Sequence, residues 1–167
     1  MPASEKRFSN DLYLSIDQGG HASRAIVFSG SGEIIAQAHR NLAIHRYDEN
    51  FVEHDPRELL SSVNEAITKV VEQLGDKARN IAAAGLATQR SNVVCWNKVS
   101  GEALSPIISW QDRREQQWLK SLTPEAQTIH HKTGLFLSPH YGASKLRWCM
   151  QNIDAVREAQ QNNELVI

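Results

Sequence analysis

The amino-acid sequence predicts an α/β fold with a mixed sheet that opens with a three-stranded antiparallel meander and is flanked by helices. Three observations predict it. Short runs of β-branched and aliphatic residues alternate with glycine turns near the start, a long amphipathic segment follows, and an almost continuous apolar run comes next. The steady alternation of strand and helix that is typical of a Rossmann domain is absent.

The meander is expected over the first forty or so residues. The apolar run 12–17 predicts a strand, and Gly19 with Gly20 predicts a tight turn. A second strand is expected over 23–28, and a second glycine turn leads into a third strand over 33–42. Each strand is joined to the next by a short turn, so the three strands are expected to be antiparallel.

A helix is expected to start at Asp55, which would cap it, with Pro56 at its first position and Glu58 placed to bond back to the cap. Gly75 is expected to end it. The apolar residues of this segment recur with helical spacing, which predicts one core-facing stripe: Leu59, Leu60, Val63, Ala66, Ile67, Val70, Val71 and Leu74.

The helices and strands after residue 80 are predicted from the same kinds of signal. The apolar run 80–88 predicts a strand buried on both faces. The remaining signals are shorter, and we expect strands over 93–96 and 107–110, a helix capped by Asp112 and reaching residue 122, helices over 124–132 and 142–152, and a final strand within 162–167.

Composition excludes several classes of function. The 167 residues include 18 Lys+Arg and 19 Asp+Glu, so the formal charge is 18 − 19 = −1, and bulk charge does not favour a nucleic-acid or membrane partner. No apolar run approaches the roughly 18 residues that a membrane span needs. Cys95 and Cys149 lie in apolar surroundings and are expected to be buried thiols of a cytoplasmic protein. Residues 1–10 are expected to be a polar leader before a domain over 11–167.

The first candidate site is the turn after the first strand. Backbone N–H groups of Gly19 and Gly20 can approach a phosphate closely, Arg24 can neutralise its charge, and Asp17 can hold the water of a metal ion. A strand follows this turn in place of a helix, which excludes Rossmann and P-loop sites. The alternative is that the glycines form a plain hairpin turn beside a surface Asp.

The second candidate site follows the apolar run 80–88, where polar residues come at the carboxyl end of an expected strand. Ligands of open α/β sheets usually bind at such ends. Gln89, Arg90, Ser91 and Asn92 can hydrogen-bond a hydroxylated substrate, with Arg90 as its anchor. The alternative is a plain exit from strand to turn.

The third candidate site combines an aromatic wall with polar groups. Trp110 beside Asp112 suits a sugar or polyol, whose C–H face is apolar and whose edge is polar, and Tyr141 is a further candidate. The alternatives are that Trp110 belongs to the core, that Asp112 only caps a helix, and that Arg113 and Arg114 form a solvated turn.

Other chemistries are disfavoured. The histidines do not show the spacing of a zinc site. Neither Cys95 nor Cys149 has sequence neighbours expected to lower its pKa, which disfavours a thiol nucleophile. The Gly-x-Ser-x-Gly elbow of hydrolases is absent.

Taken together, these segments resemble the amino-terminal part of the FGGY carbohydrate kinases, and most closely the glycerol kinases. The resemblance covers about residues 11–167. It rests on several pieces that occur in the family's order, namely 17–19 with 23–28, 51–56, 85–90, 96–98 with 100–102, 107–114, 133–135 and 143–148.

The resemblance implies a ribonuclease H-like, actin-like ATPase fold of two domains, which transfers the γ-phosphoryl of ATP with Mg²⁺ to a hydroxyl of a small sugar or polyol. It implies that the phosphate end comprises Asp17, Gly19, Gly20, His21 and Arg24, with the metal held by Asp17 through water. It also implies a substrate site of Gln89, Arg90, Ser91, Trp110, Asp112 and Tyr141. Any homo-oligomer is expected to form through the full-length protein.

Two departures from the family pattern bear on activity. Gly20, His21 and Ala22 stand where the family usually has threonines, and Ser91 stands where glycerol kinases have Glu. A hydrogen bond to a carboxylate contributes roughly 1.5–3 kcal/mol, so its loss is expected to weaken glycerol binding about 10- to 150-fold. We therefore expect a different sugar or polyol as the substrate.

The resemblance also places the catalytic-base Asp and the second, adenosine-binding domain beyond Ile167. Residues 1–167 alone are therefore expected to be inactive. A catalytically inactive actin-like module for binding or regulation is the alternative reading.

Overall fold

The computed structural model describes residues 10–167, which form two compact units. Unit 1 comprises residues 10–43 and 57–89, and unit 2 comprises residues 44–56 and 90–167. The expected polar leader lies outside the described residues apart from Asn10. Among residues 10–167, no helix combines the length and the apolar character needed to cross a bilayer.

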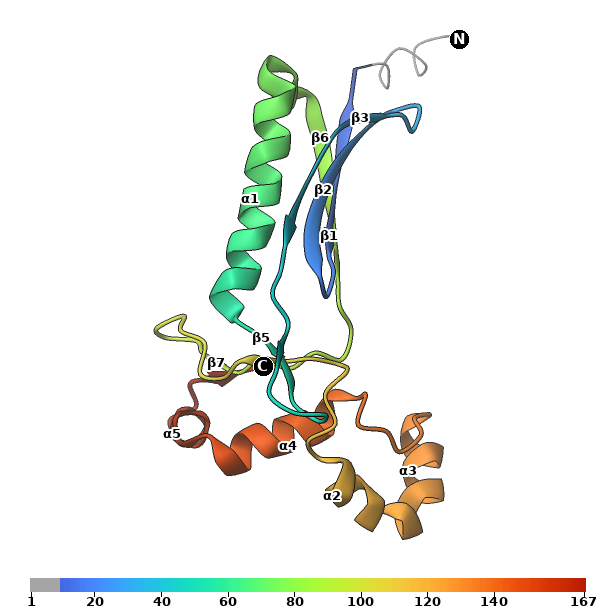
Figure 1. Cartoon of the computed structure of the whole chain (residues 1–167), viewed down its shortest axis with the longest axis vertical. Helices are drawn as coiled ribbons and strands as arrows, with labels where there is room; N and C mark the ends of the chain where they lie inside the picture. Colours follow the sequence, from blue (N-terminus) through green and yellow to red (C-terminus); the bar gives the residue numbers. More distant parts are fainter. Residues whose placement is uncertain (1–9) are drawn as a thin grey trace. The chain divides into compact units, whose positions relative to one another are not determined.

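Unit 1 contains a four-stranded mixed sheet with the order β3-β2-β1-β6 (Figure 1). The predicted meander is confirmed: β1 (Leu12–Gln18), β2 (Ala22–Ser29) and β3 (Ile34–Asn41) pair in antiparallel fashion. β6 (Ile81–Thr88) adds to β1 in parallel, as a strand returning through a helix must.

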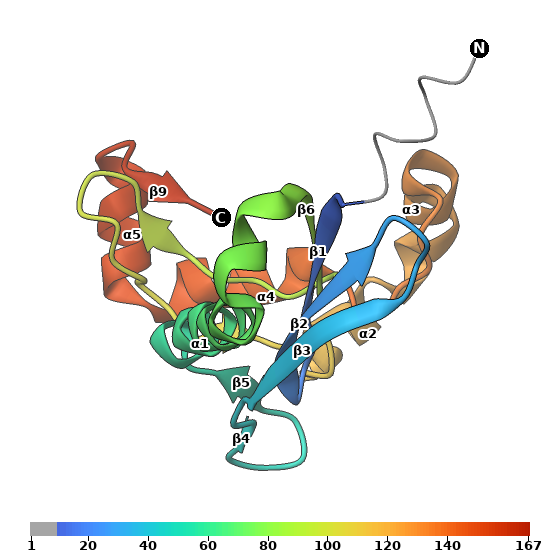
Figure 2. The same ribbon diagram turned by 90° about the horizontal axis from the view of Figure 1, so that it is seen from above.

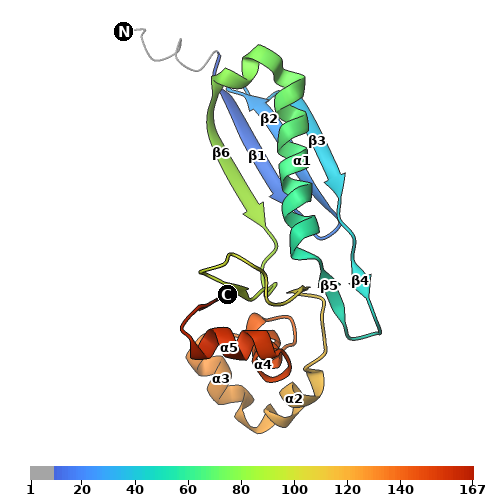
Figure 3. The ribbon, with the colours of Figure 1, turned by 90° about the vertical axis from the view of Figure 1, so that its left-hand side faces the viewer.

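Helix α1 (Pro56–Leu74) lies along the sheet of unit 1 (Figure 3). It begins at Pro56 as predicted and gives way to the 3₁₀ helix η2 (Gly75–Asn80) at Gly75, whose φ of 54° favours glycine. Its buried stripe has four-residue spacing and is joined by sheet residues in one core: Leu12, Leu14, Ala25, Val27, Ala36, Ala66, Val70 and Leu74.

The predicted stripe of α1 was too wide. Leu60 and Val71 are 61% and 37% exposed, because they lie off the line along which the helix meets the sheet. Ser62 occupies that line instead. Its hydroxyl lies 2.7 Å from the hydroxyl of Ser23 on β2, and this hydrogen bond satisfies two buried polar groups between helix and sheet.

Strand β6 is an edge strand, and the prediction that both of its faces are buried was wrong. Its residues from Ala82 to Thr88 are exposed, including Leu86 at 62%. Among the described residues, β6 pairs only with β1, and the core of α1 is built mainly on β1, β2 and β3.

Unit 2 contains two small antiparallel sheets. One has the order β4-β5-β8, formed by β4 (His45–Arg46), β5 (Val52–His54) and β8 (Ile107–Ile108). The other pairs β7 (Trp96–Asn97) with β9 (Leu165–Val166), which Figure 2 shows near the C-terminal end. The final strand was predicted, whereas β4 and β5 were not, because their residues are mainly polar and form no apolar run.

The helices of unit 2 are α2 (Gln116–Ser121), η3 (Thr123–Glu125), α3 (Ala126–Thr133), α4 (Gly142–Asn152) and α5 (Asp154–Gln161). The prediction for 142–152 is confirmed, and α5 was missed. The prediction that Asp112 caps the helix reaching residue 122 was wrong, because α2 follows Glu115 and the Asp112 carboxylate is engaged elsewhere.

The core of unit 2 contains both cysteines, which are free and fully buried as predicted. They pack with Val93, Ile108 and Val156. A hydrogen bond from Cys149 lowers the pKa of Cys95, although the sequence neighbours of Cys95 did not indicate a lowered pKa. The same hydrogen bond and burial raise the pKa of Cys149. Neither thiol is accessible to a substrate from solvent.

Candidate functional site

The end of the β1–β2 hairpin brings Asp17 and Arg24 together. The two residues are paired across the strands, and Arg24 Nη1 donates to Asp17 Oδ2 at 3.1 Å. Both side chains are about half exposed, at 48% for Asp17 and 57% for Arg24. The guanidinium is therefore positioned by the carboxylate and still open to solvent, so a phosphate can share it.

The turn between these strands has a local reason for its glycines. The Gly19 N–H donates to the carbonyl of Ala22 at 3.0 Å, and a Cβ on Gly19 would lie only 3.1 Å from that carbonyl oxygen. A Cβ on Gly20 would lie 3.2 Å from Oε1 of Gln89. Close approach to a backbone oxygen therefore favours glycine at position 19, whereas the end of the Gln89 side chain can move away from a Cβ at position 20. A plain hairpin turn would also favour glycine here, and His21 is exposed beside the turn.

Gln89 connects this turn to the end of β6. Its Nε2 donates to Gln18 Oε1 at 3.3 Å, whereas its own Oε1 is buried without a hydrogen-bond partner. An unsatisfied buried acceptor costs free energy. A donor on a ligand at the Gly20 turn would satisfy this oxygen.

This turn offers few protein ligands for a metal ion. Among residues 10–167, no group of three or more His, Cys, Asp or Glu side chains could enclose a metal ion. Asp17 supplies the hard carboxylate oxygen that Mg²⁺ prefers, and Mg²⁺ usually keeps several waters and takes the rest of its ligands from substrate phosphates. The turn therefore fits a Mg²⁺ ion that arrives with a nucleotide.

In unit 2, the segment after β6 has an unusual backbone conformation. Ser91 has a φ of 64°, in the left-handed region that non-glycine residues seldom adopt. Arg90 is exposed, and Asn92 Oδ1 accepts a hydrogen bond from the backbone N–H of Trp110 at 2.8 Å. This segment and the Trp110 backbone are thus tied together, and strained residues of this kind cluster at functional sites.

An aromatic row extends from Trp110 to Tyr141. The His140 ring meets Trp110 edge-on at a centroid distance of 5.6 Å and meets Tyr141 at 5.3 Å. Trp110 is 41% exposed, which excludes the reading that it belongs to the core. An exposed aromatic surface with polar neighbours can pack against the C–H face of a sugar.

Asp112 does not join this row. It is 1% exposed, and its carboxylate accepts bonds from Arg114 Nε and Nη2, at 2.9 and 2.8 Å, and from the Val52 N–H at 2.8 Å. Arg114 Nη2 also donates to Glu53 at 2.6 Å, and the guanidinium is packed between the rings of Phe51 and Trp148. Asp112 is therefore a structural residue that ties three segments together.

Arg114 and Arg113 behave differently, although the sequence suggested one solvated turn for both. The side chain of Arg114 is 1% exposed, with Nη1 buried and unpartnered, whereas Arg113 is exposed. Hydrogen bonds to Asp112 and Glu53 raise the pKa of Arg114, although its burial opposes them. Arg114 therefore stays positively charged between the carboxylates of Asp112 and Glu53.

A buried lysine lies close to this network. Lys145 on α4 is 1% exposed, and its Nζ donates to the carbonyls of Pro139, His140 and Tyr141 at 2.7, 2.6 and 3.1 Å. Burial lowers the pKa of Lys145 to about 8, despite the nearby charge of Asp112. These bonds fix the backbone of the segment that carries the aromatic row.

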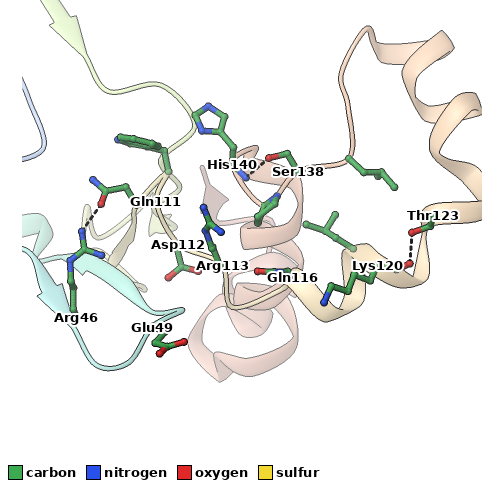
Figure 4. A pocket seen from close by; sticks show the side chains of 14 residues that line it. Arg46, Glu49, Gln111, Asp112, Arg113, Gln116, Lys120, Thr123, Ser138 and His140 are labelled. Atoms are coloured by element: carbon green, nitrogen blue, oxygen red, sulfur yellow. Dashed lines mark hydrogen bonds between the residues drawn. The ribbon is translucent and has the colours of Figure 1, made fainter.

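A pocket of about 710 Å³ opens beside the row in unit 2 (Figure 4). Trp110 and His140 line it, together with Gln111 and Asp112. Several other lining residues were not predicted from the sequence, because single polar residues in loops and short helices form no motif: Arg46, Glu49, Gln116 and Lys120.

The predicted site residues fall into two sets. Asp17, Gly19, Gly20, His21, Arg24 and Gln89 lie in unit 1, and Arg90, Ser91, Trp110, Asp112 and Tyr141 lie in unit 2. Within unit 1 the structure brings the Gly20 turn to Gln89. Within unit 2 it joins Trp110 to Tyr141 through His140 and separates Asp112 from them as a buried residue.

Comparison with solved structures identifies the fold. A Plasmodium falciparum glycerol kinase with ADP shares the fold with a TM-score of 0.87, at 22% identity, over 93% of this chain and 32% of that one. A xylulose kinase from Rhodospirillum rubrum matches with a TM-score of 0.81, at 20% identity, over 89% of this chain and 31% of that one. The fold is that of the actin-like sugar kinases, as the resemblance implied.

The chain belongs to the FGGY family of carbohydrate kinases, and residues 12–166 match the N-terminal domain of that family. Among curated relatives, the glycerol kinase of Roseobacter denitrificans is 39% identical over 155 residues, which are 92% of this chain and 31% of the relative. The glycerol kinase of Citrifermentans bemidjiense is 38% identical over 157 residues, 93% of this chain and 32% of the relative. The chain thus spans about a third of the length of these relatives.

Proposed function

We propose that this chain is the amino-terminal part of a kinase that uses ATP and Mg²⁺ to phosphorylate a hydroxyl of a sugar or polyol other than glycerol. The observation that carries the substrate class is the aromatic row of the exposed Trp110 with the half-buried His140 and Tyr141, in the same unit as Arg90. Membership in the carbohydrate kinase family supports the reaction type.

The phosphate end of the reaction is assigned to the β1–β2 hairpin. Asp17 would hold a Mg²⁺-bound water, and Arg24 and the turn at Gly19 and Gly20 would contact phosphate oxygens. The Asp17–Arg24 pair is half exposed, so opening it for a phosphate costs little. Bound Mg²⁺ would neutralise charge that develops on the transferred phosphoryl group. The protein's contribution is then mainly positioning and charge stabilisation.

The substrate end is assigned to Arg90, Ser91, Trp110 and Tyr141. Ser91 takes the place of the Glu that glycerol kinases carry, so a hydrogen bond from a glycerol hydroxyl to a carboxylate is lost at this position. The curated relatives reported above bear the name glycerol kinase, and this replacement is the reason to assign a different substrate here. Asp112 lines the pocket beside this site, and we assign it to holding the fold of this region because its carboxylate is bound by Arg114 and the Val52 N–H.

The catalytic base and the adenosine-binding domain are assigned to the rest of the full-length protein, since this chain matches about a third of its relatives' length. Residues 11–167 are then part of the N-terminal domain. Residues 1–167 alone would not transfer a phosphoryl group.

The test is ADP formation by the full-length protein with a panel of polyols, pentoses, hexoses and their derivatives, glycerol included. Stimulation by a member other than glycerol supports the proposal. A preference for glycerol overturns the substrate assignment, and the absence of any stimulation favours the inactive actin-like module.

A variant tests the residues. Arg90→Ala should raise the KM for the accepted substrate far more than the KM for ATP. Arg79→Ala is the matched control, because Arg79 is exposed in η2 and pairs with Asp76. Equal effects of Arg90→Ala on both KM values contradict its assignment to the substrate site.

A further inference from the structure

The pocket beside the aromatic row carries an excess of positive charge. Arg46 reaches it from β4, Arg113 from the segment before α2, and Lys120 from α2 (Figure 4). Within residues 10–167, none of these three cations forms a salt bridge with a carboxylate. All three side chains are exposed. They are therefore available to an anion from solvent.

The carboxylates of the pocket do not cancel this charge. Asp112 is buried and paired with Arg114, whose guanidinium it shares with Glu53, so its carboxylate is not open to solvent. Glu49 is the other carboxylate in the lining, so three available cations face one available anion. Arg46 is held in place by its bond from Nη2 to Gln111 Oε1 at 2.5 Å. A positioned guanidinium loses less entropy when it binds a carboxylate or phosphate.

The same pocket shares its wall with the candidate substrate site. Trp110 and His140 line the pocket and also form two members of the aromatic row. A ligand that packs its carbon chain on Trp110 thus has cations within the same cavity. The volume of about 710 Å³ falls in the usual range for small-molecule sites.

Ser91 lies outside the residues that line the pocket, on a segment that is joined to Trp110. It immediately precedes Asn92, whose side chain holds the Trp110 backbone. A carboxylate in place of Ser91 would add a negative charge to this segment and repel an anionic ligand. A serine at position 91 is therefore compatible with an anionic ligand in the pocket.

We propose that this pocket binds the anionic end of the substrate, and that the substrate is a sugar or polyol derivative with a terminal carboxylate or phosphate. This inference rests on the proposed function, because it names the substrate class of that site. The hydroxylated carbon chain would pack on Trp110, and the anionic group would be bound by Arg46 and Arg113, with Lys120 adding charge.

The test is isothermal titration of the 167-residue chain with matched pairs of ligands. D-Gluconate has a terminal carboxylate where D-glucitol has a hydroxyl. Glucitol 6-phosphate has a terminal phosphate instead. Aldonates of three to five carbons and their alditols extend the panel. At least one anionic member should bind about 10-fold or more tightly than its neutral partner, and its identity distinguishes carboxylate from phosphate. Inorganic phosphate should bind more weakly than that member.

Two variants assign the site. Arg46→Gln and Arg113→Gln should each weaken binding of the anionic ligand by about 10- to 100-fold, because each removes one charge-assisted hydrogen bond. The affinity for the neutral partner ligand should not change. Lys98→Gln is the control, because it removes the same charge from an exposed residue outside the pocket lining. Thermal unfolding of all three should match the wild type, since the side chains are exposed.

Equal binding of anionic and neutral partners across the panel overturns the inference. So does inorganic phosphate binding as tightly as the anionic polyols, because the pocket is then a general anion site. These readouts use no ATP, so they can succeed even if phosphoryl transfer fails. A full-length enzyme that phosphorylates neutral polyols, with a chain that shows no anion preference, refutes this inference and leaves the proposed kinase function intact.

Discussion

Asp17 and Arg24 are opposite each other in the register of β1 and β2, and their side chains are joined at 3.1 Å in a half-exposed salt bridge. Exposed pairs of this kind contribute about 0–1 kcal/mol to stability. Their placement at the end of the hairpin therefore suits binding more than folding.

Asp17→Asn should accordingly change the free energy of unfolding of the chain by less than about 1 kcal/mol in urea titrations. In the full-length protein, the same substitution should lower kcat by about 100-fold or more, the usual effect of removing one preorganised electrostatic group. Asp76→Asn, which breaks the exposed Asp76–Arg79 pair, should leave kcat unchanged. A large loss of stability in Asp17→Asn would make this residue structural.

Arg114 should be essential to the stability of unit 2. Arg114→Met leaves the carboxylates of Asp112 and Glu53 buried without their cation, so we expect the free energy of unfolding to fall by about 3–5 kcal/mol. The neighbouring Arg113→Met serves as control, with an expected change within about 0.5 kcal/mol because its side chain is exposed. Equal urea midpoints for the two variants would contradict the buried network.

Lys145 should make stability rise with pH above neutrality. Because burial lowers its pKa from 10.5 to about 8, the unfolded chain holds more protons than the folded chain between these values. Burial of the charged ammonium group lowers the free energy of unfolding by its full amount below pH 8. This destabilisation disappears as the pH rises toward 10.5. The whole shift corresponds to about 3 kcal/mol.

Urea unfolding at several pH values between 7 and 10 measures this effect. Lys145→Met should lose the rise, whereas Lys132→Met, at an exposed lysine, should keep it. A wild-type profile that falls through this window would contradict the assignment.

The left-handed backbone at Ser91 should also be measurable. Ser91→Gly should leave the stability unchanged or raise it by up to about 1 kcal/mol, and Ser91→Val should lower it by about 1–3 kcal/mol, because a β-branched residue is poorly tolerated at a φ of 64°. Asn163, with a φ of 57°, offers a matched position outside the candidate site. If Ser91→Val is as stable as the wild type, this conformation is not imposed by the fold.

Ser91→Glu tests the substrate assignment. Restoring the carboxylate should lower the KM of the full-length enzyme for glycerol by about 10- to 150-fold, the contribution of a hydrogen bond to a charged group. Ser91→Gln is the control, since it has nearly the same shape without the charge. An unchanged KM for glycerol in Ser91→Glu would show that this position does not select the substrate.

Local signals in the sequence were sufficient to predict the helices and strands whose ends are determined by residues close to those ends. Pro56 and Gly75 mark the ends of α1, and 142–152 is a helix as its pattern indicates. The three-stranded meander follows from two glycine turns between apolar runs. These signals also placed Asp17 and Arg24 at one hairpin end, because adjacent strands of a hairpin have a fixed register.

Tertiary structure alone decided which side chains are buried and which act together. The apolar pattern of β6 indicated two buried faces, yet burial depends on neighbouring elements that the pattern does not contain. Arg114 and Glu53 are 61 residues apart, and no local rule distinguishes the buried Arg114 from the exposed Arg113. The cationic pocket also depends on tertiary structure, because Arg46 and Lys120 line one cavity only after folding brings distant segments of the chain together.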